Sequence, residues 1–150
     1  MKSLAVLLRQ SGAPLPYANT RPLEIVEVDL APPGTGEVLV KIESAGICHS
    51  DLSVVNGTRQ RLLPLIAGHE SAGVVVEIGA GVKDLKVGDH VTSVFLPSCG
   101  SCSDCTSGLP AFCSLGAASN SRGEMLGGGT RISIDGEAIN HYNGVACYSQ

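Results

Sequence analysis

Residues 99–113 read Cys99-Gly-Ser-Cys102-Ser-Asp-Cys105-Thr-Ser-Gly-Leu-Pro-Ala-Phe-Cys113, so four of the six cysteines of the chain lie in one short segment. Apart from one Leu and one Phe, the residues between the cysteines are small, polar or turn-forming. Such a segment cannot bury enough apolar surface to order itself, and it therefore needs a cross-link. Four thiolates that converge on one metal ion are the candidate cross-link.

The composition of the 150 residues describes one domain that is rich in turns, with 43% hydrophobic residues, 19 Gly and 8 Pro. The net charge is −4 and no basic face is visible, which argues against a nucleic-acid partner. No apolar run reaches transmembrane length and no signal peptide is recognisable, so we expect no membrane partner and a cytoplasmic location. Thiols stay reduced in the cytoplasm, which favours a metal site over disulfides.

Short apolar or alternating segments between turn residues predict a mainly β fold with a few short helices. Alternation is clearest where Val38, Val40 and Ile42 share one face. We expect strands over residues 3–9, 23–30, 37–44 and 72–78, a turn over 87–91 that leads into a strand reaching Phe95, a hairpin arm over 131–135, and a strand that starts at 145. A short helix is expected within 46–57, starting near Cys48–Asp51, and loops over 10–21, 59–63 and 124–130. This pattern is typical of a small β-barrel.

The four clustered cysteines can supply all the ligands of a closed, tetrahedral structural zinc site. Two-residue spacers let neighbouring sulfurs point at one position, and the longer spacer lets the chain return around the metal. We expect this cysteine lobe to span about residues 96–116. Two alternatives remain open, a pair of disulfides and an iron–sulfur cluster, although the last spacer is longer than in ferredoxins and no Pro follows Cys113.

A second set of candidate ligands lies in two short motifs, Cys48-His49-Ser50-Asp51 and Gly68-His69-Glu70. A catalytic zinc keeps three protein ligands and one open position. Cys48 and His69 are the candidate ligands. Asp51 is expected to orient His69 through its second ring nitrogen, and Glu70 is either an outer partner of the site or an alternate ligand.

With these motifs in this order, the sequence resembles the N-terminal, GroES-like catalytic domain of the zinc-dependent medium-chain alcohol dehydrogenases. The family's zinc signature is matched by Gly68-His69-Glu70, Gly73, Gly79 and Val82, and the turn Val87-Gly88-Asp89-His90-Val91 also fits. The resemblance covers nearly the whole chain. It implies a GroES-like, partly open β-barrel over residues 1–150, from which the structural-zinc lobe protrudes.

The resemblance also implies roles for single residues. Cys48 and His69 match two of the three catalytic-zinc ligands, and the third, a Cys, is expected beyond Gln150. Ser50 matches the hydroxyl that receives the proton of the alcohol, and His49 matches a position that contacts the cofactor pyrophosphate. Phe95 matches a wall of the substrate pocket, with an ordinary core aromatic as the alternative.

Six further positions are assigned less specific roles. Ser53 stands where some family members carry a His that completes the proton relay. Arg59 and Arg61 are expected in a solvated loop, with a contact to a polar or anionic substrate as the alternative. Cys147 is expected to be a core thiol, and we expect His90 and His141 to be structural or surface residues.

The implied function is that of an NAD- or NADP-dependent alcohol dehydrogenase, in which zinc polarises a small alcohol, aldehyde or ketone for hydride transfer. Neither Gly34-Thr35-Gly36 nor Gly79-Ala80-Gly81 continues into a dinucleotide-binding fingerprint. A Rossmann domain is therefore expected after residue 150. The 150 residues alone should fold without turning over, and the full-length protein should be a homo-oligomer. The alternatives are a non-catalytic, zinc-stabilised scaffold and an iron–sulfur redox protein.

Overall fold

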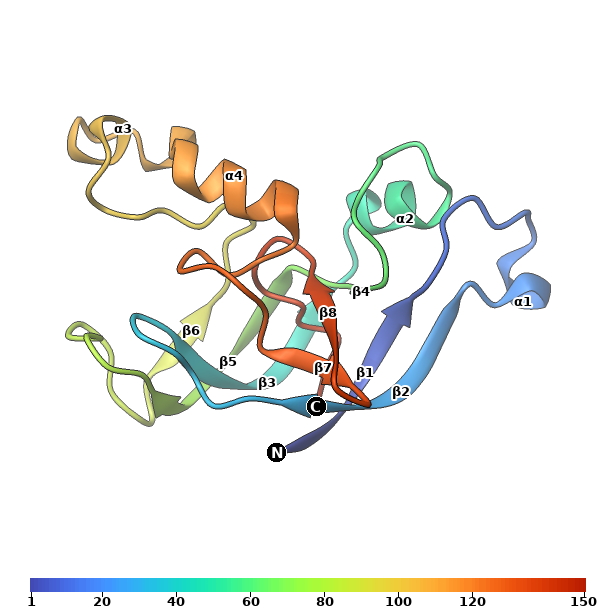
Figure 1. Ribbon diagram of the computed structural model, residues 1–150, viewed down its shortest axis with the longest axis horizontal. Helices are drawn as coiled ribbons and strands as arrows, with labels where there is room; N and C mark the ends of the chain where they lie inside the picture. The colour runs from blue at the N-terminus through green and yellow to red at the C-terminus, as the bar shows by residue number, and fades with distance from the viewer.

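The computed structural model describes residues 1–150 and contains two β-sheets. Five strands form a closed barrel in the order β1-β2-β7-β8-β4, and three antiparallel strands form a second sheet in the order β3-β5-β6 (Figure 1). The barrel strands are β1 (Lys2–Leu8), β2 (Leu23–Leu30), β4 (Leu65–Ile66), β7 (Ile132–Ile134) and β8 (Glu137–His141). The strands of the second sheet are β3 (Val38–Gly46), β5 (Glu70–Ile78) and β6 (His90–Thr92).

The barrel is held by paired strands that turn alternate side chains inward. Strand β1 pairs with β2 along its whole length, from Lys2–Asp29 to Leu8–Leu23. Residues Ala5 and Leu7 of β1 are buried, as the period of a strand requires. Their side chains belong to a core cluster that also contains Val28, Ile66, Ile132, Ile139 and Ala146. Both chain termini lie at one edge of this barrel, where Leu4 and Gln150 exchange backbone hydrogen bonds (Figure 1).

At one end of the second sheet, the turn after β5 lies against the turn before β3. A Cβ added to Gly79 would lie 1.8 Å from the carbonyl oxygen of Gly34, a distance that no side chain can occupy. The Gly79 N–H also donates to the Glu37 carbonyl oxygen at 2.8 Å. Glycine at position 79 therefore lets β5 end against the turn that precedes β3.

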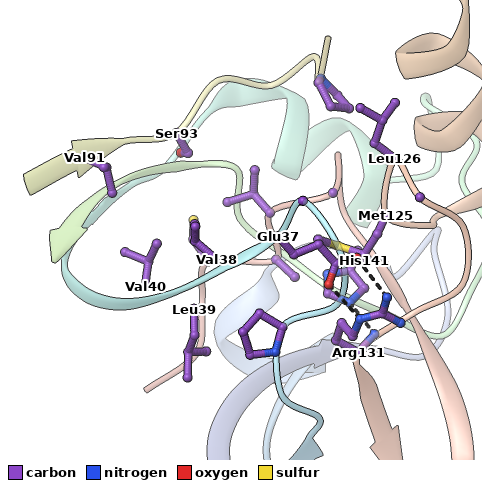
Figure 2. A pocket seen from close by; sticks show the side chains of 18 of the residues that line it. Glu37, Val38, Leu39, Val40, Val91, Ser93, Met125, Leu126, Arg131 and His141 are labelled. Atoms are coloured by element: carbon purple, nitrogen blue, oxygen red, sulfur yellow. Dashed lines mark hydrogen bonds and ion pairs between the residues drawn. The ribbon is translucent and has the colours of Figure 1, made fainter. Parts of the chain in front are cut away.

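A cavity of about 780 Å³ lies between the barrel and the second sheet (Figure 2). Its only charged side chains are Glu37 and Arg131, which form a bidentate pair with N–O distances of 2.7 and 2.9 Å. His141 lines the same cavity, and its Nε2 accepts the Arg131 backbone N–H at 3.1 Å. Burial lowers the pKa of His141 to about 4, so this imidazole is neutral and structural. The cavity thus offers no unpaired charge to a ligand.

Four α-helices and one 3-10 helix connect the strands. They are α1 (Tyr17–Thr20), α2 (His49–Val55), α3 (Ser103–Thr106), η1 (Pro110–Phe112) and α4 (Ser114–Arg122). The segment with α3 and η1 protrudes from the body of the molecule, and α4 leads back to it (Figure 1). None of the helices has the length and apolar character needed to cross a bilayer.

The expected mainly β fold is confirmed, with some differences in its elements. The barrel is closed, because the two-residue strand β4 pairs with both β1 and β8. No strand was predicted there, since two residues are too few to show a periodic pattern. Helix α4 was also missed, because Ser114–Arg122 is polar and small and has no apolar stripe.

Three expected segments differ in extent. The strand predicted to reach Phe95 ends at Thr92. The strand expected from residue 145 is reduced to one isolated bridge between Ala5 and Ser149. The loop predicted over residues 10–21 contains the single helical turn α1. The two strand segments depend on pairing with distant residues, which local patterns do not encode, whereas α1 is a single local turn.

Candidate metal centres

The four cysteine sulfurs of the lobe converge on one point. All four Sγ atoms lie within 4.8 Å of one another. The Cys99 and Cys105 sulfurs are 4.0 Å apart, and those of Cys102 and Cys113 are 3.9 Å apart. A tetrahedral zinc with Zn–S bonds of about 2.3 Å places its sulfurs about 3.8 Å apart. All six cysteines are free thiols, so the disulfide alternative finds no support.

Backbone N–H groups of the lobe point at two of these sulfurs. The Cys99 sulfur accepts from the N–H groups of Ser101 and Cys102, at 3.4 and 3.2 Å. The Cys113 sulfur accepts from Cys99 and Gly116, at 3.4 and 3.3 Å. Hydrogen bonds from Ser101, first from its hydroxyl, lower the pKa of Cys99 to about 6, and the Cys99 N–H lowers the pKa of Cys113. The lobe is thus prepared for thiolates, the form that binds metal.

One member of the lobe is electrostatically different. Burial raises the pKa of the Cys105 thiol to about 12. A nearby divalent cation reverses such a shift, because it favours the thiolate strongly. The arrangement of the four sulfurs therefore suits four thiolates around a metal ion better than four protonated thiols in contact.

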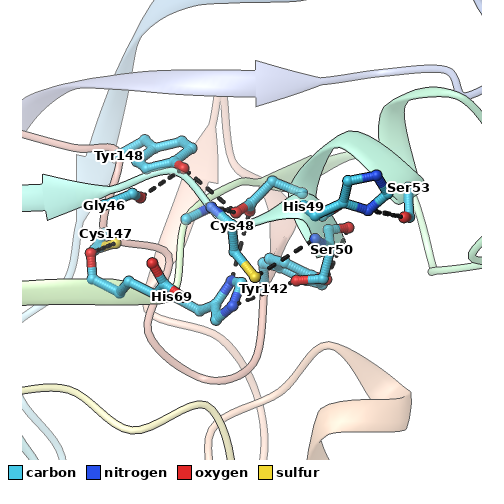
Figure 3. Close-up of polar contacts among 12 residues, drawn as sticks. Gly46, Cys48, His49, Ser50, Ser53, His69, Tyr142, Cys147 and Tyr148 are labelled. Atoms are coloured by element: carbon cyan, nitrogen blue, oxygen red, sulfur yellow. Dashed lines mark hydrogen bonds and ion pairs between the residues drawn. The ribbon is translucent and has the colours of Figure 1, made fainter.

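A second group of possible ligands consists of Cys48, His69 and Glu70 (Figure 3). One donor atom from each residue lies within 4.8 Å of the others. Cys48 is the N-cap of α2, His69 follows β4, and Glu70 is the first residue of β5. The fold therefore brings together the two motifs that sequence analysis singled out.

Asp51 ties these segments together from a buried position, with a side chain that is 7% exposed. Its Oδ2 accepts the Cys48 N–H at 3.1 Å, and its Oδ1 accepts the Gly68 N–H at 3.1 Å. The same Oδ1 lies 3.6 Å from Nδ1 of His69. The carboxylate thus faces the second ring nitrogen, as the sequence predicts, and leaves Nε2 directed to the Ser50 hydroxyl at 3.4 Å.

Three residues near the C-terminus complete the site, and sequence analysis missed their contacts. The Tyr142 ring meets His69 edge-on, with centroids 5.0 Å apart, and its hydroxyl donates to the Ser50 carbonyl oxygen at 3.3 Å. The Tyr148 hydroxyl reaches the Gly46 carbonyl oxygen and Asp51, and the buried Cys147 thiol donates to the Glu70 carbonyl oxygen at 3.5 Å. The one feature of the sequence that could have drawn attention to the two tyrosines is that the chain has only five Phe and Tyr residues in all.

The remaining residues singled out in the sequence are at least partly exposed. The Ser53 hydroxyl lies 3.3 Å from Nδ1 of His49, on the first turns of α2. The Phe95 side chain is 63% exposed within these 150 residues. Arg59 is exposed, whereas the Arg61 guanidinium lies over the Tyr142 ring, 5.7 Å from its centroid. His90 is exposed, as expected of a surface residue.

The fold and the two ligand groups define a GroES-like β-barrel domain with a zinc-type cysteine cluster, which confirms the expected fold. The alcohol dehydrogenase GroES-like domain family model matches residues 34–140. The chain belongs to this family.

Known relatives agree with this assignment. An S-(hydroxymethyl)glutathione dehydrogenase of Escherichia coli is 42% identical over 142 residues, which are 94% of this chain and 38% of the relative. The crystal structure of an alcohol dehydrogenase zinc-binding domain protein from Burkholderia ambifaria matches with a TM-score of 0.85 and 32% identity, over 99% of this chain and 38% of that chain. Benzyl alcohol dehydrogenase from Acinetobacter calcoaceticus matches with a TM-score of 0.82 and 29% identity, over the same shares. The chain thus spans 38% of the length of the relatives it matches.

Proposed function

We propose that this chain is the zinc-binding catalytic part of an NAD- or NADP-dependent alcohol dehydrogenase. Cys99, Cys102, Cys105 and Cys113 hold a structural zinc, and the Cys48–His69–Glu70 group holds a catalytic one. The observation that carries the proposal is the convergence of three donor atoms within 4.8 Å, with the Ser50 hydroxyl 3.4 Å from Nε2 of His69. The family membership supports it.

The donor set of the second group fits a catalytic zinc. Thiolate and imidazole are zinc ligands, and a buried carboxylate against the other ring nitrogen is the usual partner of a ligating His. Glu70 is exposed and supplies the third donor within this chain. The family resemblance expects a Cys beyond Gln150 as the third ligand, with Glu70 as its alternate.

The residues around this centre have separate tasks. Zinc bound there supplies Lewis acidity, which lowers the pKa of an alcohol hydroxyl. Asp51 holds the His69 ring so that Nε2 faces the site. The Ser50 hydroxyl, 3.4 Å from that nitrogen, receives the alcohol proton and passes it outward. His49 is proposed to contact the cofactor pyrophosphate, and the exposed Phe95 ring is proposed to line the substrate pocket.

The nicotinamide performs the redox step and is proposed to bind a Rossmann domain beyond these 150 residues. The relatives' names, S-(hydroxymethyl)glutathione dehydrogenase and benzyl alcohol dehydrogenase, support a small alcohol, aldehyde or ketone as the substrate. The 150-residue chain supplied with NAD and an alcohol is expected not to turn over. A cytoplasmic location and a homo-oligomeric full-length protein stay predictions.

Zinc stoichiometry tests the proposal directly. Equilibrium dialysis and elemental analysis of the 150-residue chain should give two zinc ions per chain. His69→Ala should retain only the lobe zinc, and Cys113→Ser only the zinc at Cys48 and His69.

Three results would contradict the proposal or a part of it. One zinc in the wild type, unchanged by His69→Ala, would leave a zinc-stabilised scaffold as the function. Visible absorption with bound iron would indicate the iron–sulfur alternative. Zinc at both sites together with substantial NAD-dependent turnover by this chain would refute the need for a second domain.

A further inference from the structure

Tyr148 lies behind the Cys48–His69–Glu70 group, although it is 79 positions from His69 in the sequence (Figure 3). Its hydroxyl lies 2.8 Å from the carbonyl oxygen of Gly46 and 3.3 Å from Oδ2 of Asp51. Gly46 ends strand β3, and Asp51 lies in the first turn of helix α2. Tyr148 therefore contacts the chain on both sides of Cys48.

The Tyr148 ring is fixed by its fit against Gly68. A Cβ added to Gly68 would lie 2.5 to 2.8 Å from three ring carbons, so the ring occupies the space that any other residue at position 68 would fill. Gly68 also has a φ of +90°, a conformation that glycine adopts at little cost. The first glycine of the Gly68-His69-Glu70 motif thus has a physical reason, since it admits the aromatic ring directly beside His69.

The hydroxyl of Tyr148 acts as a donor at this position. A carbonyl oxygen and a carboxylate oxygen can only accept, so the phenol proton is shared between Gly46 and Asp51. Burial, followed by the negative charge of Asp51, raises the pKa of Tyr148 well above its usual value of 10, which keeps the proton in place.

Asp51 uses each of its oxygens for two contacts. Oδ2 accepts from Tyr148 and from the Cys48 N–H, while Oδ1 accepts the Gly68 N–H and faces Nδ1 of His69. Rotation of the carboxylate would break all of these contacts at once. The phenol is the only side-chain donor on Oδ2, so its removal leaves that oxygen with a single backbone partner.

We propose that Tyr148 is a positioning residue, whose hydroxyl holds the Asp51 carboxylate against His69 and thereby raises the affinity of the Cys48–His69–Glu70 group for zinc. This inference rests on the proposed function, because it assumes that this group binds zinc. Outer partners of metal-ligating side chains typically contribute about 10- to 100-fold in metal affinity. Tyr148 acts one step further out, through a hydrogen bond that it shares with Gly46, so we expect about a tenfold effect.

The test is a zinc titration of Tyr148→Phe against a chelator of known affinity. This substitution keeps the ring that fills the space beside Gly68 and removes only the hydroxyl. Zinc affinity at the Cys48–His69–Glu70 group should fall about tenfold, while the affinity of the cysteine lobe stays unchanged. The lobe curve is measured separately with His69→Ala. Tyr17→Phe removes a phenol from helix α1 that packs against the same core cluster as Tyr148 but makes no hydrogen bond to Asp51, Gly46 or His69, and it is the matched control.

A second variant separates positioning from general stability. If Tyr148 acts through Asp51, then Tyr148→Phe should change zinc affinity less than about twofold on an Asp51→Asn background. Additive effects in this double-mutant cycle would overturn the inference, as would equal losses at both metal sites. Unchanged affinity in Tyr148→Phe would overturn it while the proposed function stands. A wild type without zinc at His69 would overturn both.

Discussion

Glu37→Gln tests whether a buried ion pair joins the two sheets of this domain. Glu37 lies just before β3, its side chain is 8% exposed, and Arg131, just before β7, is 28% exposed. Three donors converge on the carboxylate: Nε of Arg131 at 2.7 Å, Nη2 of the same guanidinium at 2.9 Å, and the Gly34 N–H at 2.7 Å. Both side chains line the cavity, and their ion pair links the turn before β3 to the segment before β7 (Figure 2).

The expected loss follows from what glutamine can still do. An amide oxygen in the Oε2 position can still accept two of the three hydrogen bonds, from the Gly34 N–H and from Nε of Arg131, but the amide nitrogen then faces Nη2 of a guanidinium that only donates. Hydrogen bonds to charged groups contribute about 1.5 to 3 kcal/mol each, and breaking a fully buried pair costs about 3 to 5 kcal/mol. Arg131 is partly exposed and can recover some hydration. We therefore expect Glu37→Gln to lower the free energy of unfolding by about 3 kcal/mol.

Urea unfolding of zinc-loaded protein, followed by circular dichroism, measures this loss. The matched control is Glu43→Gln in strand β3 itself, which removes an exposed pair with Lys41 at 3.1 Å and should cost less than about 0.5 kcal/mol. An equal, small loss in both variants would refute the reasoning, because it would mean that the Glu37 pair contributes no more than a surface pair.

Two further changes test other parts of the fold. Burial lowers the pKa of His141 from 6.5 to about 4, so the unfolded chain takes up its proton first as the pH falls. Unfolding free energy should therefore drop by about 3 kcal/mol between pH 6.5 and pH 4, and the drop should be missing from His141→Gln; identical pH profiles would contradict this. Gly79→Ala places a methyl group 1.8 Å from the Gly34 carbonyl oxygen and should cost about 3 kcal/mol or more in urea unfolding. Gly127→Ala, which meets nothing within 4 Å, is its control, and equal stability of the two variants would refute the steric argument.

The sequence predicted the elements that depend on neighbouring residues. Strand β2 was predicted with its observed bounds, because its alternating pattern is local. The start of helix α2 was predicted near Cys48–Asp51, where Cys48 caps the helix and Asp51 accepts the Cys48 N–H. Strand β4 and helix α4 were not predicted, because one is fixed only by its neighbours β1 and β8 and the other has no amphipathic pattern.

The candidate site divides in the same way. The ligand types and their spacing follow from the sequence, since short spacers at Cys99, Cys102 and Cys105 bring sulfurs together in almost any compact conformation. Cys48 and His69 could be named as candidate ligands from their residue types, but sixteen residues separate the two motifs, so the sequence did not show that they meet. The structure places Cys48 within hydrogen-bond distance of Asp51, brings the donor atoms of Cys48 and His69 within 4.8 Å, and leaves Oδ1 of Asp51 3.6 Å from Nδ1 of His69.

The sequence by itself determined which chemistry this chain can hold, since thiols, imidazoles and their spacing are covalent properties of the chain. Only the tertiary structure decided how that chemistry is oriented. Tyr142 and Tyr148 approach the site from a segment more than seventy residues away from His69, and Gly68 leaves room for one of their rings. These contacts depend on barrel closure, which places the C-terminal residues beside β1, and no local pattern in the sequence encodes that closure.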